Sequence, residues 1–351
     1  MRSHPRRLLT SLAIALLTVI AGAPGSAMAG SAPTCQDTFV PVRLSPGAPA
    51  DYRVYGRLCL PAGPRPDTVQ LLVSGLTYDH TYWDLPDPRG GDRFSYTSSA
   101  LHAGYATFAI DRIGVGRSSH PLGLSVTIDS NSVSLHDVIQ ALRSGTMGPT
   151  GFHRVVLVGH SYGSWVSWYE ASDFHDVDAV ILSGVSHYIN LTSPIRLLTR
   201  LYPAAADSSY TSRTDQVLDP TYLTSLPGQR YTMFQEPSVV EPALISYDET
   251  HKQTVTTGEI DNFALILVRP LDIRVPVLLA NGSEDRLFCG LGGADCSSAS
   301  GLVASERARL GNRAPSVRAY VLNGSGHDLN YDSHAQQWFQ AAQQWVQSVA
   351  R

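Results

Sequence analysis

Short apolar runs alternate with amphipathic segments along most of the chain. The runs are rich in Val, Leu and Ile, as in VQLLVS at 69–74, and the segments between them carry apolar residues at helical spacing. Continuously apolar strands separated by helices are typical of a parallel sheet that helices cover on both faces. We therefore predict strands at 69–74, 105–110, 154–158, 179–182, 275–280 and 317–322, and helices at 96–103, 130–143, 164–172 and 333–349.

This alternation stops near residue 185 and resumes near residue 273. The segment between is richer in Tyr, Pro, Thr and Ser and has short helical stretches such as 194–201 and 260–268. Such an insertion fits best over one end of the sheet. The sequence therefore predicts an α/β core with a mostly parallel, doubly wound sheet, formed by 30–184 and 273–351, with a mainly helical cap at 185–272.

The N-terminus has the pattern of a secretory signal peptide. Arg2, Arg6 and Arg7 precede an apolar run at 8–23, and the small-residue site Ala27-Met28-Ala29 follows. A retained membrane anchor is the alternative, but the run is shorter than the ~20 residues that a spanning helix needs. We expect residues 1–29 to be removed and the protein to be secreted without a stable membrane anchor. The arginine pair leaves a twin-arginine export route open.

Charge excludes a nucleic-acid partner. The whole chain has 26 basic and 30 acidic side chains, a formal net charge of −4. The first 29 residues contain three of the arginines and no carboxylate, so the remainder has 26 − 3 = 23 basic groups and a balance of 23 − 30 = −7. An acidic chain without a Lys/Arg cluster is a poor nucleic-acid binder.

All four cysteines follow the predicted leader. An even number of cysteines in an oxidising compartment indicates two disulfides, for which three pairings are possible. Predicted strands at 38–44 and 52–60 form a hairpin that brings Cys35 near Cys59, so that Cys289 and Cys296 close a small glycine-rich loop. Free buried thiols are the alternative.

The sequence Gly159-His160-Ser161-Tyr162-Gly163 has the pattern G-x-S-x-G of a nucleophile elbow. It lies between the predicted strand at 154–158 and the predicted helix at 164–172, which is the strand-to-helix context that this turn requires. The turn presents Ser161 as a nucleophile at the sheet edge. Backbone amides of Tyr162 and of Leu76, in the loop after the first parallel strand, are the expected oxyanion donors.

A serine nucleophile needs a base and an orienting carboxylate, which follow it in the chain in the order acid, then histidine. His327 stands in a glycine-rich loop directly after the strand at 317–322, whereas His334 has the position of a surface or capping histidine. Asp285 follows the strand at 275–280 and is our choice for the acid, with Glu284 in reserve.

Together these motifs resemble the α/β-hydrolase superfamily. The loop D-x-x-G-x-G-x-S at 111–118 is similar to a segment that shapes the active-site floor in that family, while 282–285 and 326–327 resemble its acid turn and histidine loop. Two departures are Ser74, where many relatives carry His, and the absence of a Gly-Gly-rich oxyanion loop typical of one lipase subgroup. A serine nucleophile argues against the epoxide-hydrolase and dehalogenase branches, which use Asp.

The resemblance implies a secreted serine hydrolase of the EC 3.1.1 type that cleaves a carboxylic ester or lactone through an acyl-enzyme on Ser161. It needs no cofactor and no metal, and the histidines outside the motifs are scattered. The expected partner is a small or medium-sized acyl substrate; the oligomeric state is not predicted. The aromatic residues near the motifs either line an apolar acyl pocket or pack the core: Tyr78, Trp83, Tyr162 and Trp165.

Two alternatives remain open at this stage. The first is an exported amidase or aminopeptidase of the same fold, in which a cap carboxylate holds the substrate amine; the candidates are Glu236, Glu241, Asp248 and Glu249. The second is a non-catalytic binding protein with a hydrolase fold.

Overall fold

The structure is a computed structural model that describes residues 1, 32–147, 150–210 and 219–350. The chain divides into two compact units, Met1–Ser31 and Ala32–Arg351. Beyond Met1, the predicted leader lies outside the described residues, and everything below concerns the second unit. No helix of the described residues is long and apolar enough to cross a membrane.

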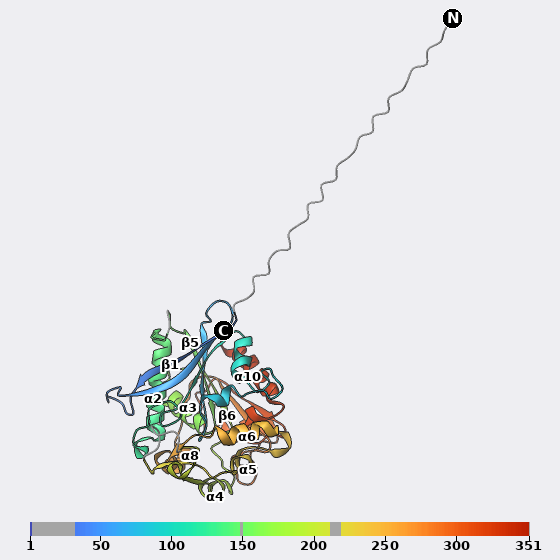
Figure 1. Ribbon diagram of the computed structural model, residues 1–351. Helices are drawn as coiled ribbons and strands as arrows, with labels where there is room; N and C mark the ends of the chain where they lie inside the picture. The colour runs from blue at the N-terminus through green and yellow to red at the C-terminus, as the bar shows by residue number, and fades with distance from the viewer. Residues whose placement is uncertain (2–31, 148–149, 211–218, 351) are drawn as a thin grey trace. The chain divides into compact units, whose positions relative to one another are not determined.

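Eight strands form one sheet in the order β1-β2-β4-β3-β5-β6-β10-β11 (Figure 1). The first two strands form an antiparallel hairpin, β2 is antiparallel to β4, and all pairs from β4 to β11 are parallel. The predicted mostly parallel sheet is therefore confirmed. The strands are β1 (Thr34–Val42), β2 (Tyr52–Leu60), β3 (Thr68–Val73), β4 (Ala106–Ile110), β5 (Arg154–His160), β6 (Ala179–Ser183), β10 (Val277–Gly282) and β11 (Val317–Leu322).

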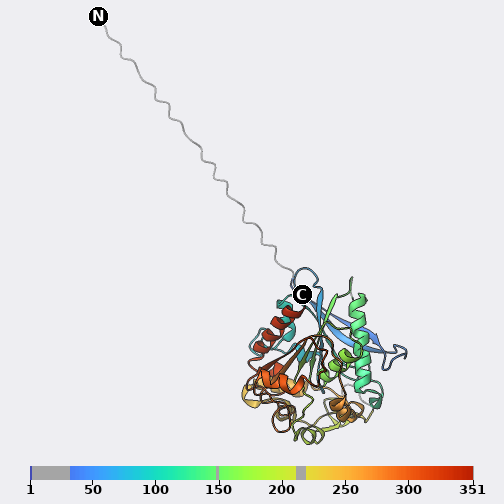
Figure 2. The same cartoon turned by 180° about the vertical axis from the view of Figure 1, so that it is seen from behind.

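Helices cover both faces of this sheet. Helix α2 packs against α3, and α1 packs against α10; Figure 2 shows α10, in red, and α2, in green, on opposite sides of the strands. The central strands β3 to β6 and β10 are buried at every residue except Arg154, the first of β5, which explains their mostly apolar sequence. These helices are α1 (Tyr96–His102), α2 (Ile128–Ser144), α3 (Tyr162–Asp173), α9 (Ala299–Glu306) and α10 (Ala335–Val349).

Residues between β6 and β10 form the insertion. Its described residues form five short α-helices and a second, antiparallel sheet in the order β7-β8-β9. Figure 1 shows α4, α5, α6 and α8 together at one end of the main sheet. The helices are α4 (Ser193–Leu198), α5 (Arg230–Phe234), α6 (Pro242–Thr250), α7 (Thr257–Asp261) and α8 (Phe263–Val268), and the strands are β7 (Leu201–Pro203), β8 (Tyr222–Ser225) and β9 (Val255–Thr256). Short 3-10 helices lie at His80–Trp83, Gly123–Ser125, Ala204–Ala206, Pro237–Val239 and Leu329–Tyr331.

The helical stretch predicted at 260–268 is divided in the structure between two helices that meet at Asn262. A capping box between Thr256 and Glu259 starts α7 earlier than predicted, and Asn262 separates it from α8. The Asn262 side chain accepts a hydrogen bond from the Ile128 backbone N–H at 3.2 Å, which fixes this turn against the start of α2. Strands β7 to β9 are two to four residues long, too short for an alternating pattern to reveal them.

Both disulfides have the pairing that the hairpin predicted. Strand β1 starts earlier than expected, so Cys35 lies directly opposite Cys59 in the β1–β2 ladder and is bonded to it. Cys289 is bonded to Cys296 and closes a short loop after β10.

Candidate active site

Ser161 lies at the turn from β5 into α3 with a strained backbone, at φ 53° and ψ −122°. Positive φ is unusual for a residue with a side chain and is typical of functional turns. The two flanking glycines are required by space. A Cβ on Gly159 would lie 2.6 Å from the Gly163 carbonyl oxygen, and a Cβ on Gly163 would lie 2.2 Å from that of Val73. Only glycine therefore fits at the first and last positions of the G-x-S-x-G turn.

The loop after β3 lies directly against Ser161. A Cβ added to Gly75 would be 2.9 Å from the Ser161 Cβ. Leu76 follows in this loop, and Tyr162 follows Ser161 as the first residue of α3. Within the part of the chain that the structure describes, the backbone N–H groups of Leu76 and Tyr162 have no acceptor. Both amides are thus free to donate to an oxyanion beside Ser161.

His327 is oriented by Asp285. The His327 Nδ1 lies 2.9 Å from Asp285 Oδ2, and the other carboxylate oxygen accepts backbone N–H groups of Leu287 and Phe288 at 2.8 and 3.3 Å. His327 and Asp285 are both buried, whereas Glu284 is exposed and contacts Ser283. The structure therefore brings Asp285 to the histidine, and Glu284 stays outside.

The end of β6 lies between Ser161 and His327. The Ser161 N–H donates to the Ser183 carbonyl at 2.8 Å, at the end of β6. The next residue, Gly184, has φ 56°, and a Cβ there would lie 3.2 Å from His327 Cε1. The His327 ring also lies 4.9 Å from that of His160, the neighbour of Ser161. The ends of β5, β6, β10 and β11 thus bring Ser161, Asp285 and His327 to one edge of the sheet.

The surroundings of His327 favour its charged form. Burial by itself lowers the pKa of the His327 imidazole, but the charge of Asp285 and the hydrogen bond to it outweigh burial and raise the pKa above its ordinary value. Asp328 acts in the same direction. This histidine is therefore a stronger base than an exposed one.

A second cluster of buried polar side chains lies beside His327 and Asp285. The sequence analysis did not identify it. Asp328 Oδ1 is 3.1 Å from His160 Nε2, and the Tyr78 hydroxyl donates to Asp328 Oδ2 at 2.5 Å. Burial raises the pKa of Asp328 to about 6, although His327, Tyr78 and Arg230 act to lower it. Burial lowers the pKa of His160 well below its ordinary value, so this ring is neutral. Adjacency to Ser161 and His327 was the only sequence signal for these two residues.

Two buried arginines hold the loop that follows β3 and carries Leu76. Arg112 donates to the carbonyl oxygens of Ser74 and Gly75 at 3.0 and 3.3 Å and pairs with Glu259 of α7. Arg230 of α5 donates to the Thr77 hydroxyl at 2.6 Å. The insertion thus supports the loop that carries Leu76. Ser74, which departs from the histidine of many relatives, donates to the Tyr78 carbonyl at 3.0 Å, within the same loop.

An apolar pocket of about 370 Å³ lies beside Ser161, and we call it the Ser161 pocket. Of the four aromatic residues singled out in the sequence, Tyr162 and Trp165 line it; Tyr78 and Trp83 are buried elsewhere in the core. Most other lining residues come from the insertion and from the loop after β10: Ile189, Ser193, Pro194, Leu197, Leu198, Phe234, Ile260, Asp261, Phe263, Ala264, Leu267, Leu287 and Phe288; Leu76 and Ser161 complete the wall.

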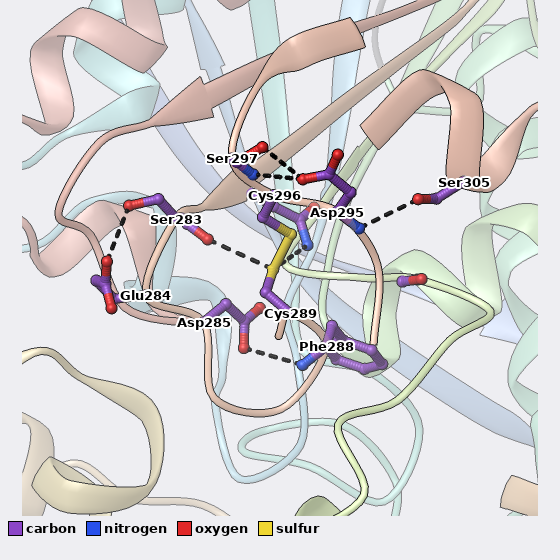
Figure 3. Close-up of a disulfide and its surroundings, with 12 residues drawn as sticks. Ser283, Glu284, Asp285, Phe288, Cys289, Asp295, Cys296, Ser297 and Ser305 are labelled. Carbon is purple, nitrogen blue, oxygen red and sulfur yellow. Dashed lines mark hydrogen bonds between the residues drawn. A yellow bond between two sulfur atoms is a disulfide. The ribbon is translucent and has the colours of Figure 1, made fainter. Parts of the chain in front are cut away.

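The Cys289–Cys296 disulfide fixes the loop that carries both the acid and part of this wall. Figure 3 shows the disulfide beside Asp285 and Phe288. The Cys289 N–H donates to the Asp285 carbonyl at 2.9 Å, and Asn190 of the insertion donates to the Cys289 carbonyl at 2.8 Å. The loop is therefore tied to the acid turn at one end and to the insertion along its side.

Three groups of described side chains are close enough to share a metal ion. In each group a histidine nitrogen already lies 2.7 to 3.1 Å from a carboxylate oxygen. We therefore assign none of them as a metal centre. The groups are His160, His327 and Asp328; Asp79, His80 and Asp111; and His136, Glu170 and Asp176. His334, the other late histidine, is exposed at the start of α10 and lies 3.1 Å from Asp332.

Solved structures share this fold. An esterase from Thermogutta terrifontis has a TM-score of 0.53 at 17% identity, covering 90% of this chain and 99% of that chain. A bromoperoxidase from Bacillus anthracis has a TM-score of 0.56 at 16% identity, covering 89% and 100%. The epoxide hydrolase VrEH1 from Vigna radiata has a TM-score of 0.57 at 17% identity, covering 90% and 98%. At this identity the similarity establishes the fold alone.

A sequence model described as "Alpha/beta hydrolase family" matches residues 70–341. This range runs from β3 to α10 and includes Ser161, Asp285 and His327. No curated protein matches the chain.

Proposed function

Because this chain belongs to the alpha/beta hydrolase family, we propose that it is a serine hydrolase that cleaves carboxylic esters or lactones through an acyl-enzyme on Ser161. The observation that carries the proposal is a strained serine close to a histidine that is bonded to a buried carboxylate, with two free amides beside the serine. Ser161, Leu76 and Tyr162 line one apolar pocket. This combination suits nucleophilic acyl transfer.

In the proposed reaction His327 removes the proton from the Ser161 hydroxyl as its oxygen attacks the substrate carbonyl. The amides of Leu76 and Tyr162 donate hydrogen bonds to the oxyanion of the tetrahedral intermediate. His327 then protonates the leaving alcohol, and an acyl-enzyme remains on Ser161. Water, deprotonated by His327, attacks this ester and releases the acid. Asp285 holds the imidazole in the required tautomer and stabilises its charged form.

The Ser161 pocket favours an apolar acyl group. Its lining is almost entirely aliphatic and aromatic, and such a surface gains free energy by removing methylene groups from water, at about 0.8 kcal/mol for each. We infer a cap at 185–272 over a core of 30–184 and 273–351, and a substrate of small or medium size.

We further propose that the protein is secreted after removal of residues 1–29. The leader pattern of the sequence supports this location, and two disulfides suit an oxidising compartment.

The aminopeptidase alternative has little support from the insertion carboxylates. All four candidates are paired: Glu236 with Arg286, Glu241 with Arg93, Asp248 with Arg230 and Glu249 with Lys252. Among the pocket-lining residues, Asp261 is the one carboxylate left to hold a substrate amine. A panel of esters, lactones and aminoacyl anilides decides between these reactions, and faster cleavage of the anilides would contradict the ester or lactone proposal.

Replacement of the nucleophile tests the proposal directly. We expect Ser161→Ala to lower kcat for a soluble p-nitrophenyl ester by about 10⁴-fold or more, since base and oxyanion donors have no nucleophile to act on. Only the parent protein should react covalently with a fluorophosphonate probe. If the folded parent is not labelled, the chain is a binding protein instead. Equal activity in the variant would refute the assignment of Ser161.

A further inference from the structure

Glu170 is a fully buried carboxylate that the proposed reaction does not use. It lies on α3, nine residues after Ser161 and thus about 13 Å from it along the helix axis. No hydrogen-bond donor of the described residues reaches either of its carboxylate oxygens, although its side chain has no exposed surface. Buried polar groups are nearly always hydrogen-bonded, so an exception of this kind calls for a bound group or a function.

Two further potential metal ligands lie beside Glu170. His136 of α2 places its Nδ1 atom 3.9 Å from Glu170 Oε1. Asp176, in the connection from α3 to β6, places Oδ2 at 2.8 Å from the same nitrogen. The three ligand atoms all lie within 4.8 Å of one another. Two atoms bound to one zinc ion at about 2.1 Å in tetrahedral geometry lie about 3.4 Å apart, which is between these two distances.

This group differs from the other two groups of potential metal ligands. Short distances alone assign none of the three as a metal centre. In the other two groups every carboxylate oxygen has a hydrogen-bond partner; those carboxylates are Asp79, Asp111 and Asp328. Here no donor reaches Glu170 Oε1, Glu170 Oε2 or Asp176 Oδ1. The His136 Nδ1 atom also lacks a hydrogen bond, because its close approach to Asp176 does not have the direction of one.

The negative charge of the group is not balanced by a basic side chain. Within the part of the chain that the structure describes, no arginine or lysine forms an ion pair with Glu170 or Asp176, and Arg143 pairs with Asp178 instead. Burial and the neighbouring Asp176 raise the pKa of Glu170 well above its ordinary value, so without a cation this carboxyl keeps a proton. A divalent cation between the two carboxylates would take the place of that proton.

Neighbouring side chains orient two of the three ligands. The His136 ring stacks on the Phe174 ring, with centroids 4.0 Å apart and planes inclined by 13°. Gln140, one turn after His136 on α2, donates to Asp176 Oδ2 at 2.6 Å. Side chains that hold metal ligands in this way are part of many metal sites. The side chains of His136 and Asp176 are 20% and 16% exposed, so an ion from solvent can reach the group.

We propose that His136, Glu170 and Asp176 form a structural site for a divalent transition-metal ion, with zinc as the best fit. One imidazole nitrogen and two carboxylates are a donor set that suits zinc, whereas magnesium and calcium prefer oxygen ligands alone. The bound ion joins α2 to the end of α3 and to the connection that leads into β6. The site is separate from Ser161, and it does not rest on the proposed hydrolysis.

Calorimetric titration with zinc chloride tests the site. We expect the protein, purified without its leader and freed of metal with EDTA, to bind one zinc ion per chain at pH 7.5. Glu170→Gln and His136→Gln should each weaken binding at least tenfold. His102→Gln is the matched control and should leave binding unchanged, because His102 is exposed and lies near one carboxylate only, that of Asp92 at 3.6 Å. Absence of zinc binding to the parent, or equal binding by Glu170→Gln, would overturn the proposal.

Thermal unfolding distinguishes a bound ion from a shared proton. Excess zinc should raise the melting temperature of the parent and of His102→Gln but not that of Glu170→Gln, because only a folded protein with an intact site is stabilised by the ion. Metal-free Glu170→Gln should melt no lower than the metal-free parent, since its amide is neutral without a proton. If this variant does not fold, His136→Gln decides, and unchanged zinc binding there refutes the site. Stabilisation by calcium but not by zinc would contradict the transition-metal assignment.

Discussion

Two buried carboxylates act on the pKa of His327. Asp285 follows β10, and Asp328 follows β11. Asp285 is bonded to Nδ1, and Asp328 adds negative charge from the side of His160. Both carboxylates raise the pKa of His327 against the effect of burial. The protonation of this one residue should therefore set the lower pH limit of activity.

The charge of Asp285 should be visible in the pH profile. A general base acts only when neutral, so activity rises with pH through the pKa of His327, and half-maximal kcat/KM should lie above pH 6.5. In Asp285→Asn the raising charge is lost and this midpoint moves to lower pH, while kcat falls by about 10⁴-fold because the tautomer is no longer held. Glu284→Gln is the control and should stay within twofold. A larger loss in that control would move the role of the acid to Glu284.

Asp328 should behave as a positioning residue with a weaker effect. In Asp328→Asn the acid midpoint should again move to lower pH, by less than in Asp285→Asn, because Asp328 is the minor contributor to the pKa of His327. We expect kcat to fall about tenfold, because the ring of His160, the neighbour of Ser161, loses the carboxylate that holds it. Steady-state kinetics from pH 5 to 9 measure both quantities. A lower melting temperature with an unchanged pH midpoint would show that Asp328 is only structural.

At the level of elements, the insertion and the core share a buried ion pair. Arg112 follows β4 and reaches two carbonyls of the loop after β3, and its partner Glu259 belongs to the capping box of α7. A guanidinium holding two loop carbonyls fixes the direction in which the Leu76 amide points. The start of α7 is therefore coupled to the geometry of the oxyanion hole that we propose.

Removing one partner of this pair should be costly. We expect Glu259→Gln to lower the free energy of unfolding by about 3 kcal/mol, because Arg112 keeps a buried charge without a counter-ion. Asp173→Asn breaks the partly exposed pair with Arg269 and should cost less than about 1 kcal/mol. Urea denaturation compares the two variants. Equal losses would mean that burial does not determine the strength of the Arg112–Glu259 pair.

The sequence predicted elements whose stabilising interactions are local or periodic. Continuous apolar strands, the elbow glycines and the positions of Ser161, Asp285 and His327 after strand ends could be predicted, because each leaves a pattern along the chain. The break at Asn262 could not, since it depends on a hydrogen bond from Ile128, far away in sequence. The pairing of Asp328 with His160 and of Arg112 with Glu259 was hidden for the same reason.

At the scale of the whole molecule, one of the two disulfides lies beside the candidate active site and the other lies in the hairpin at the edge of the sheet. Cys35–Cys59 joins neighbouring strands of the hairpin at the edge of the sheet, with 24 residues of sequence separation. Cys289–Cys296 spans seven and lies between the acid turn and the insertion. Stability and activity should therefore depend on different disulfides.

Paired cysteine replacements test this separation. Loop-closure entropy predicts losses of about 3.5 kcal/mol in unfolding free energy for Cys35→Ser/Cys59→Ser and about 2.5 kcal/mol for Cys289→Ser/Cys296→Ser. Esterase activity at 25 °C should stay near that of the parent in the first variant and fall at least tenfold in the second, since Leu287 and Phe288 both line the pocket and hold Asp285. The reverse order of activities would contradict this assignment.

The Cys289–Cys296 disulfide separates a position that must stay fixed, Asp285, from one that can be changed, Leu291. Asp285 is fixed by hydrogen bonds before the first cysteine, whereas Leu291 projects at the tip and is 70% exposed. Because the disulfide closes this loop after Asp285, side chains at its tip can be exchanged without displacing the acid. The tip of this loop is therefore a place where the surface beside the insertion can be altered while Asp285 stays in position.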